Sequence, residues 1–190
     1  MIKWNPEYEY LRYDYNLNEE SIILDFGGYK GNFANKIFKK FNCKIFVYEP
    51  IVEYYNNLQD IFKSNSKITV NNYGVLDYTG KSIIYLQEDG TSIFLQNNNH
   101  MIIDVVDVVT VMENFKYIDL LKINVEGSEY CILKRMIENN LHTKCKNIQI
   151  QFHPFFENSN IMRDEIRNKL CITHELTFNF PFIWENWKIK

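Results

Sequence analysis

The sequence lacks any apolar run near the roughly 18–20 residues that a membrane-spanning helix requires. Residues 1–5 have no apolar core of the kind found in a secretory signal, so we expect a cytoplasmic protein. Cysteine is scarce and scattered, at positions 43, 131, 145 and 171, with no CxxC pair and no cysteine–histidine cluster. These absences argue against a structural zinc site and a disulfide framework, and they favour reduced thiols within the packing.

Proline and glycine are also few, with four and seven residues, and no stretch rich in them marks a linker. The 190 residues contain no internal repeat and suit one domain. The hydrophobic fraction of 46% and the charged fraction of 24% are typical of a globular chain rather than a disordered one. The net charge of −3 argues against nucleic acid as the main partner, because phosphate-binding proteins usually carry a basic face.

Apolar patterns alternate along the chain between strand-like and helix-like periods, which predicts βα units around a parallel sheet. The last two predicted strands form a hairpin across residues 179–181, so we expect a mostly parallel seven-stranded sheet with an antiparallel last strand. The predicted strands are 22–26, 44–48, 68–72, 119–124, 147–152, 172–178 and 182–189, and the predicted helices are 31–41, 51–62, 128–139 and 160–170.

The middle of the chain departs from this alternation. Residues 82–86 and 104–111 are rich in β-branched side chains, and no helical pattern lies between them, which predicts a small antiparallel β insertion. The polar stretch 96–100 predicts a mobile loop. We therefore expect one α/β domain over residues 1–190, with a helical segment at 1–20 and the core at 21–190.

The segment DFGGYKG, residues 25–31, follows the first predicted strand and opens the first helix. Glycines there let the backbone turn tightly and approach a ligand, and the helix start directs free N–H groups at the same place. Glu49 ends the second strand, where a carboxylate accepts the hydroxyls of a ribose. Glycines after a strand also occur in plain turns, but their combination with Glu49 favours a nucleoside site.

The acidic residue in this segment distinguishes between cofactors. Asp25 precedes glycines at 27, 28 and 31, a spacing that differs from the GxGxxG of dinucleotide sites. A carboxylate repels the phosphates of a dinucleotide but attracts the ammonium and sulfonium groups of S-adenosylmethionine. The segment therefore favours S-adenosylmethionine over NAD.

An ordered set of motifs over about residues 20–190 resembles the FkbM-type methyltransferase family. The resemblance implies a Rossmann-like class I methyltransferase fold, S-adenosylmethionine as cofactor, and methyl transfer to a hydroxyl, commonly on a sugar or a polyketide-type product. The most specific segment is LLKINVEGSEYCIL (120–133), which is similar to the family's LLKIDVEGxE. The other matching segments are ILDFGGYKG (23–31), VYEP (47–50), VNNYGVLDYTG (70–80), DGTSIF (89–94) and IQFHP (150–154).

Two positions depart from the family pattern. Asn124 stands where the family usually has Asp, and Gln151 where it usually has Glu. A neutral amide is a poor proton acceptor and a weaker metal ligand than a carboxylate. We therefore predict no metal site, and the identity of the general base stays open.

Catalytic candidates follow two predicted strands at the carboxyl edge of the sheet. We expect His153 or Glu126 to act as base, with Asn124 and Lys122 orienting the acceptor. Glu126 is equally well explained as a charge at a helix start, and His153 as a packed histidine before Pro154.

The predicted cofactor contacts extend from the glycine turn to the third strand, with Asp77 proposed for the adenine. The full set is Asp25, Gly27, Gly28, Tyr29, Gly31, Glu49, Pro50, Gly74, Asp77 and Asn124. The expected function is O-methylation of a sugar, a glycan or another small molecule. An RNA ribose methyltransferase and a cofactor-binding module without turnover remain alternatives, and the oligomeric state cannot be derived from the sequence.

Overall fold

The computed structural model describes residues 5–87, 90–92 and 100–190. Its main sheet has seven strands in the order β10-β11-β9-β8-β1-β2-β3. The pairs β9–β8, β8–β1, β1–β2 and β2–β3 are parallel, whereas β11 runs antiparallel to both of its neighbours. The predicted α/β fold with an antiparallel last strand is therefore confirmed. The strands are β1 (Ile22–Phe26), β2 (Lys44–Tyr48), β3 (Ile68–Asn71), β8 (Leu120–Ile123), β9 (Asn147–Ile150), β10 (His174–Phe180) and β11 (Trp184–Ile189).

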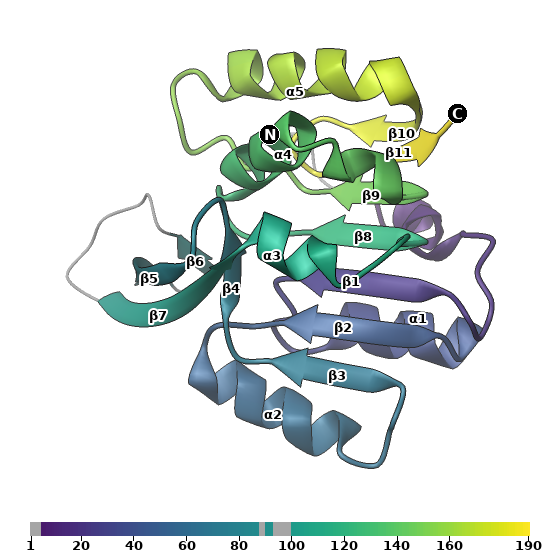
Figure 1. Cartoon of the computed structure of the whole chain (residues 1–190), viewed down its shortest axis with the longest axis vertical. Coiled ribbons are helices and arrows are strands. Elements are labelled where there is room, and N and C mark those ends of the chain that lie inside the picture. Colours follow the sequence, from purple (N-terminus) through teal and green to yellow (C-terminus); the bar gives the residue numbers. More distant parts are fainter. Residues whose placement is uncertain (1–4, 88–89, 93–99) are drawn as a thin grey trace.

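Helices cover both faces of this sheet (Figure 1). Successive residues of β1 point to opposite faces: Ile23 packs with side chains of α1 and α2, and Leu24 packs with side chains of α4. Among the described helices, none has the length and apolarity that crossing a bilayer demands. The helices are η1 (Pro6–Tyr13), α1 (Asn32–Phe41), α2 (Val52–Phe62), α3 (Val108–Glu113), α4 (Glu129–Glu138), η2 (Leu141–Lys144) and α5 (Ser159–Thr173), where η marks a 3-10 helix.

The inserted segment forms a second sheet in the order β4-β7-β5-β6. Its strands are β4 (Gly74–Leu76), β5 (Gly80–Gln87), β6 (Gly90–Ser92) and β7 (His100–Asp107). The insertion is antiparallel at β5–β6 and β5–β7, as predicted, and gains a parallel pairing between β4 and β7. In Figure 1 the arrowheads of β2, β3 and β8 point towards this small sheet, so it stands at their carboxyl ends.

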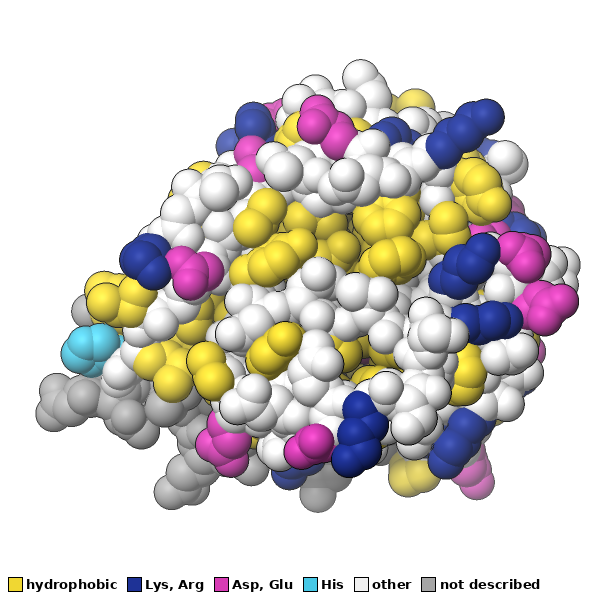
Figure 2. Space-filling model, turned by 60° about the horizontal axis from the view of Figure 1, so that its bottom comes forward, with side chains coloured by type: hydrophobic (Ala, Val, Ile, Leu, Met, Phe, Trp, Pro, Cys, Tyr) yellow, Lys and Arg dark blue, Asp and Glu magenta, His cyan; other side chains and the backbone are white. Residues whose placement is uncertain are grey.

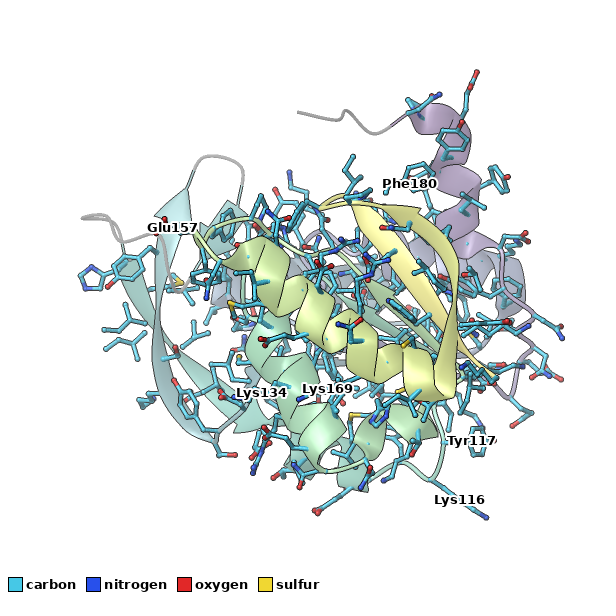
Figure 3. The ribbon with its side chains drawn as sticks, turned by 90° about the horizontal axis from the view of Figure 1, so that it is seen from above. Lys116, Tyr117, Lys134, Glu157, Lys169 and Phe180 are labelled. Carbon is cyan, nitrogen blue, oxygen red and sulfur yellow. The ribbon has the colours of Figure 1, made fainter. Side chains whose placement is uncertain are left out.

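The view from above adds the C-terminal layer (Figure 3). Helix α5 lies beside α4, and Glu157, in the loop that joins β9 to α5, lies on the side of the small sheet. Phe180, at the end of β10, lies near η1, and its ring centroid is 5.0 Å from that of Tyr8. The loops after β9 and β10 are therefore placed at the same edge of the sheet as the loop after β1.

Two predicted elements need correction. The predicted strand 104–111 ends at Asp107, because the Asp107 carboxylate accepts a hydrogen bond from the N–H of Val109 (2.9 Å) and starts α3. The last hairpin turns over residues 181–183 rather than 179–181, because Asn179 and Phe180 still pair with Glu185 and Trp184 in the sheet. Of the loop predicted at 96–100, residues 96–99 lie outside the described residues, and His100 begins β7.

Candidate functional site

The turn after β1 is built as the glycine pattern predicts. Gly27 has φ +85°, and a Cβ on it would lie 2.0 Å from the carbonyl oxygen of Asn124, so only glycine fits. The N–H groups of Gly27 and Gly28 both donate to the carbonyl of Tyr48, at 3.0 and 3.2 Å. The turn is therefore fixed against the ends of β2 and β8, and α1 begins directly after it.

The other two glycines of the turn serve packing. A Cβ on Gly28 would lie 2.2 Å from the Cγ1 of Val47, and one on Gly31 would lie 2.7 Å from the Cδ2 of Leu58. Both bring the start of α1 close to β2 and α2. The residue between them that faces the cavity is Tyr29, which takes a positive φ of 47°.

Glu49 directly follows β2 and lies beside the glycine turn. Its carboxylate accepts hydrogen bonds from the N–H groups of Tyr29 (2.7 Å) and Ile51 (3.0 Å), and the side chain is buried. Burial raises the pKa of Glu49, which these backbone bonds partly oppose. A carboxylate has about four acceptor positions, so two remain for a ligand.

A cavity of about 270 Å³ opens between this turn, the end of β8 and the small sheet. The predicted site residues that line it are Gly27, Tyr29, Glu49, Pro50, Gly74, Asn124 and Glu126. The apolar and aromatic walls of the cavity were not predicted from the sequence; they comprise Tyr48, Ile51, Tyr54, Val75, Leu76, Ile84, Ile103, Val105 and Val125. The apolar residues of β7 do not alternate in the sequence, since exposed Ile102 precedes buried Ile103, so only the tertiary fold shows which of them form the wall.

Lys122 does not face the cavity, which corrects its predicted role towards the acceptor. Its Nζ donates to the Oδ1 of Asp25 (2.8 Å), the carbonyl of Phe26 (3.4 Å) and the carbonyl of Gly27 (2.6 Å). An ammonium has three N–H donors, and these contacts use all of them. Lys122 therefore fixes the glycine turn through its backbone carbonyls and is not available to a ligand.

Asp25 is likewise displaced from its predicted place beside the cofactor. It is fully buried and lies outside the cavity lining, because its side chain points to the α1 face of the sheet, where it pairs with Lys122. Asp77 is exposed in the segment after β4 and is also outside the lining, so its contact with an adenine stays a prediction.

Asn124 stands where β8 ends, on the cavity wall. Its N–H donates to the carbonyl of Phe26 (3.1 Å), which aligns it with the glycine turn. Within the described part of the chain, its Oδ1 is buried and has no hydrogen-bond partner. Buried polar atoms are nearly always paired in native proteins, so an unpaired amide oxygen at a cavity indicates a missing donor.

The second predicted cluster surrounds His153, which follows β9. Its Nδ1 lies 2.9 Å from the Oε1 of Glu129, and its Nε2 lies 3.3 Å from the Oε2 of Glu126. The imidazole is buried and stacks against the ring of Phe155 at 5.1 Å. Glu126 lines the cavity, whereas His153 lies behind it. The structure therefore brings the two predicted bases together and adds Glu129, which the prediction lacked.

Proton affinities in this cluster are perturbed. Burial alone lowers the pKa of His153, but the hydrogen bond to Glu129 and the charges of Glu129 and Glu126 outweigh it, so the pKa lies above its usual value. Burial raises the pKa of Glu126; His153 opposes this and Glu129 adds to it. Both groups therefore bind a proton more readily than they would in water.

Comparison with known proteins gives one family and one fold. The family model described as the methyltransferase FkbM domain matches residues 25–180. An rRNA methylase from Streptococcus thermophilus is 10% identical with a TM-score of 0.58, and the match covers 100% of this chain and 98% of the other. SMU.1697c from Streptococcus mutans, solved in complex with SAH, is 10% identical with a TM-score of 0.59 over 100% of both chains. No curated protein sequence matches.

Proposed function

The chain belongs to the FkbM methyltransferase family and is an S-adenosylmethionine-dependent methyltransferase, and we propose that its acceptor is a hydroxyl of a sugar, a glycan or another small molecule. The observation that carries the proposal is the pair of Glu126 and His153, 3.3 Å apart, at a cavity that begins at the glycine turn. A hydroxyl needs a base to take its proton as the new bond forms, and this pair supplies one. We also propose that residues 21–190 form the catalytic core.

The residues at the cavity fit the cofactor. Gly27 leaves no room for a side chain where a ligand approaches the turn, and Asn124 presents an unpaired oxygen within the described chain. Glu49 places a carboxylate on the wall, which attracts a cationic ligand. When bound, S-adenosylmethionine supplies an electrophilic methyl group on a positively charged sulfur.

The cavity wall that faces the acceptor also takes up the proton that the acceptor hydroxyl loses. We assign to Glu126 the contact with the acceptor hydroxyl, because Glu126 lines the cavity and His153 does not. The proton that leaves the hydroxyl is accepted by the Glu126 carboxylate, with His153 behind it as the next acceptor. Asn124, on the same wall, orients the acceptor or the amino-acid end of the cofactor through its amide.

The surface charge favours a small acceptor over RNA, although rRNA is the substrate named for the similar Streptococcus thermophilus protein. Phosphate binding requires lysines and arginines that are not already neutralised. On the face shown in Figure 2, basic and acidic side chains are neighbours along one edge. Four lysines near α1 and β2 lie within 4.0 Å of a carboxylate of residues 9–20, in the pairs Lys36–Glu9 (3.4 Å), Lys40–Asp14 (3.9 Å), Lys44–Glu20 (2.9 Å) and Lys67–Glu19 (3.8 Å).

Calorimetric titration with S-adenosylmethionine, S-adenosylhomocysteine and NAD tests the cofactor site. We expect both methyl-cycle compounds to bind, NAD not to bind, and Glu49→Ala to weaken binding strongly. Glu53→Ala is the matched control, because Glu53 lies four residues further on, exposed in the first turn of α2. Binding of NAD, or equal effects of the two variants, would contradict the assigned site.

Transfer of a labelled methyl group tests the acceptor class. Purified protein is incubated with labelled S-adenosylmethionine and either a panel of mono- and oligosaccharides or an RNA of mixed sequence. Label in the sugars supports the proposal, and label in the RNA overturns it in favour of an RNA methyltransferase. Cofactor binding without label in any acceptor would favour a binding module without turnover.

A further inference from the structure

Glu129, the first residue of α4, is fully buried and holds two separate segments together. Its Oε2 accepts a hydrogen bond from the N–H of Gly127 (2.8 Å), in the turn that carries Glu126. Its Oε1 accepts one from the N–H of His153 (2.6 Å) and lies 2.9 Å from the Nδ1 of the same residue. A charge at a helix start would be satisfied by backbone N–H groups alone, so the contact with the imidazole is an additional feature.

From this geometry we infer that Glu129 is a positioning residue, which holds His153 with its proton on Nδ1 and its Nε2 directed at Glu126. Glu129, His153 and Glu126 then form one connected series of polar groups, hydrogen-bonded at Nδ1 and within ion-pair distance at Nε2, that begins in the core and ends at the cavity. The backbone supports this orientation, because Tyr130, the next residue of α4, donates from its hydroxyl to the carbonyl of His153 (2.8 Å). The imidazole is therefore fixed from both its ring and its main chain.

The two nitrogens of the His153 imidazole have different roles in this arrangement. A carboxylate at Nδ1 can only accept, so this nitrogen carries a proton in both the neutral and the charged imidazole. Glu126 also faces the ring, but its distance of 3.3 Å to Nε2 is longer than the 2.9 Å hydrogen bond at Nδ1. Nε2 is therefore the nitrogen that loses its proton when the ring becomes neutral. A proton that reaches Glu126 from the cavity has a second acceptor directly behind it.

The charges around His153 come from three elements. Glu129 on α4 and Glu126 in the turn before it favour the protonated ring, and Lys122 on β8 disfavours it. Phe155, in the loop after β9, contributes an apolar face. Of these groups, Glu129 makes the hydrogen bond to the ring and is also the one most deeply buried, at 0% exposure. Its charge is expected to act on His153 with little screening by water.

This inference rests on the proposed function, since it concerns the same base, but its first test requires no acceptor. The chain has four histidines, so each imidazole signal can be assigned by single replacement and followed by NMR from pH 5 to 9. We expect His153 to titrate above the ordinary value of about 6.5, and its pKa to fall by about one pH unit or more in Glu129→Gln. Glu138→Gln, which removes an exposed carboxylate from the last residue of the same helix, is expected to leave the titration unchanged.

The nitrogen chemical shifts of His153 in the unaltered protein give a second test, which does not depend on whether a variant folds. We expect the neutral ring to carry its proton on Nδ1, and a proton on Nε2 would overturn the inference. A His153 titration that Glu129→Gln leaves unchanged would overturn it as well.

The third test is the rate of methyl transfer, which can be measured once an acceptor is known. We expect Glu129→Gln to lower kcat with little change in the KM for S-adenosylmethionine, and Glu129→Asp to restore part of the pKa and part of kcat. Failure to find any methylation would count against the proposed function, whereas the NMR results would still decide the role of Glu129.

Discussion

Two buried clusters of charge flank β8, and they differ in whether they reach the cavity. Asp25 and Lys122 form an ion pair at 2.8 Å that is sealed between the sheet and α1, and all three protons of the lysine are used. Glu129 and His153 form a second buried pair, but this one continues to Glu126, whose side chain is 30% exposed on the cavity wall. The first cluster has no proton to exchange with a ligand, and the second has.

This difference teaches that buried charge alone does not identify chemistry. Lys122 and Asn124 are two residues apart, yet one supports the glycine turn from below and the other lines the cavity. An ion pair sealed in the core stabilises a fixed geometry, whereas a proton on a group next to a cavity can move. Mutation of the Glu126 cluster should therefore lower turnover more than stability, and mutation of the Asp25–Lys122 pair should lower stability more.

The largest expected effect is on turnover. Glu126→Gln removes the carboxylate that takes the acceptor proton, so kcat should fall about 10²–10⁴-fold. Because Glu126 lies at the cavity wall rather than in the core, the free energy of unfolding and the affinity for S-adenosylhomocysteine should change little. Steady-state kinetics, calorimetry and urea unfolding measure these quantities, with the exposed Glu138→Gln as control. A variant with unaltered kcat would remove Glu126 from the base role.

In the Asp25–Lys122 pair the main effect of mutation should be on the free energy of unfolding. Lys122→Met leaves the carboxylate of Asp25 buried without its partner, which costs about 3–5 kcal/mol of unfolding free energy. Adding Asp25→Asn should recover a large part of this loss, because no unpaired charge then remains. Lys44→Met, which breaks an exposed pair with Glu20, is the control and should leave the urea midpoint almost unchanged. Similar midpoints for the two lysine variants would contradict a buried pair.

A smaller effect is expected from crowding the turn that Lys122 supports. Gly28→Ala places a Cβ 2.2 Å from the Cγ1 of Val47, and we expect a loss of about 1–3 kcal/mol together with weaker binding of S-adenosylhomocysteine. Gly74→Ala is the matched control, since its Cβ would lie 3.3 Å from the Cγ1 of Val105 and can be accommodated by a small shift. If both variants lost the same free energy of unfolding, the packing assigned to Gly28 would be wrong.

The smallest effect concerns a third buried group, at the opposite edge of the sheet. His174 is fully buried, and burial lowers its pKa, so the folded protein keeps it neutral. The unfolded chain takes up a proton first as the pH falls below about 6.5, so this histidine makes the protein less stable towards acid. His153, with its raised pKa, acts in the opposite sense.

The contribution of His174 is therefore measured as a difference between the original protein and His174→Asn. We expect the stability advantage of the original protein to shrink as the pH is lowered from 7 to 5. A constant difference for His174→Asn would show that this residue is not kept neutral by burial.

The sequence predicted the order of strands and helices because this information is local. The apolar run of β1, the glycines at 27, 28 and 31, and Glu49 at the end of β2 specify a strand, a turn and a helix by their own periods and backbone preferences. The main error, strand in place of helix at residues 108–111, arose where β-branched residues suggested extension, whereas the capping carboxylate of Asp107 starts a helix there.

What the sequence by itself determined, then, is the alternating α/β chain, the glycine turn and the residues that stand at the carboxyl ends of its strands. Only the tertiary structure decided which of those polar residues share a cavity. A strand turns successive side chains to opposite faces, but which face meets a helix and which meets a ligand depends on what packs there. Asp25 and Lys122 therefore lie on the α1 face, where Lys122 contacts the ring of Phe33. The small sheet supplies apolar cavity walls at Ile84, Ile103 and Val105, and α4 places Glu129 against His153.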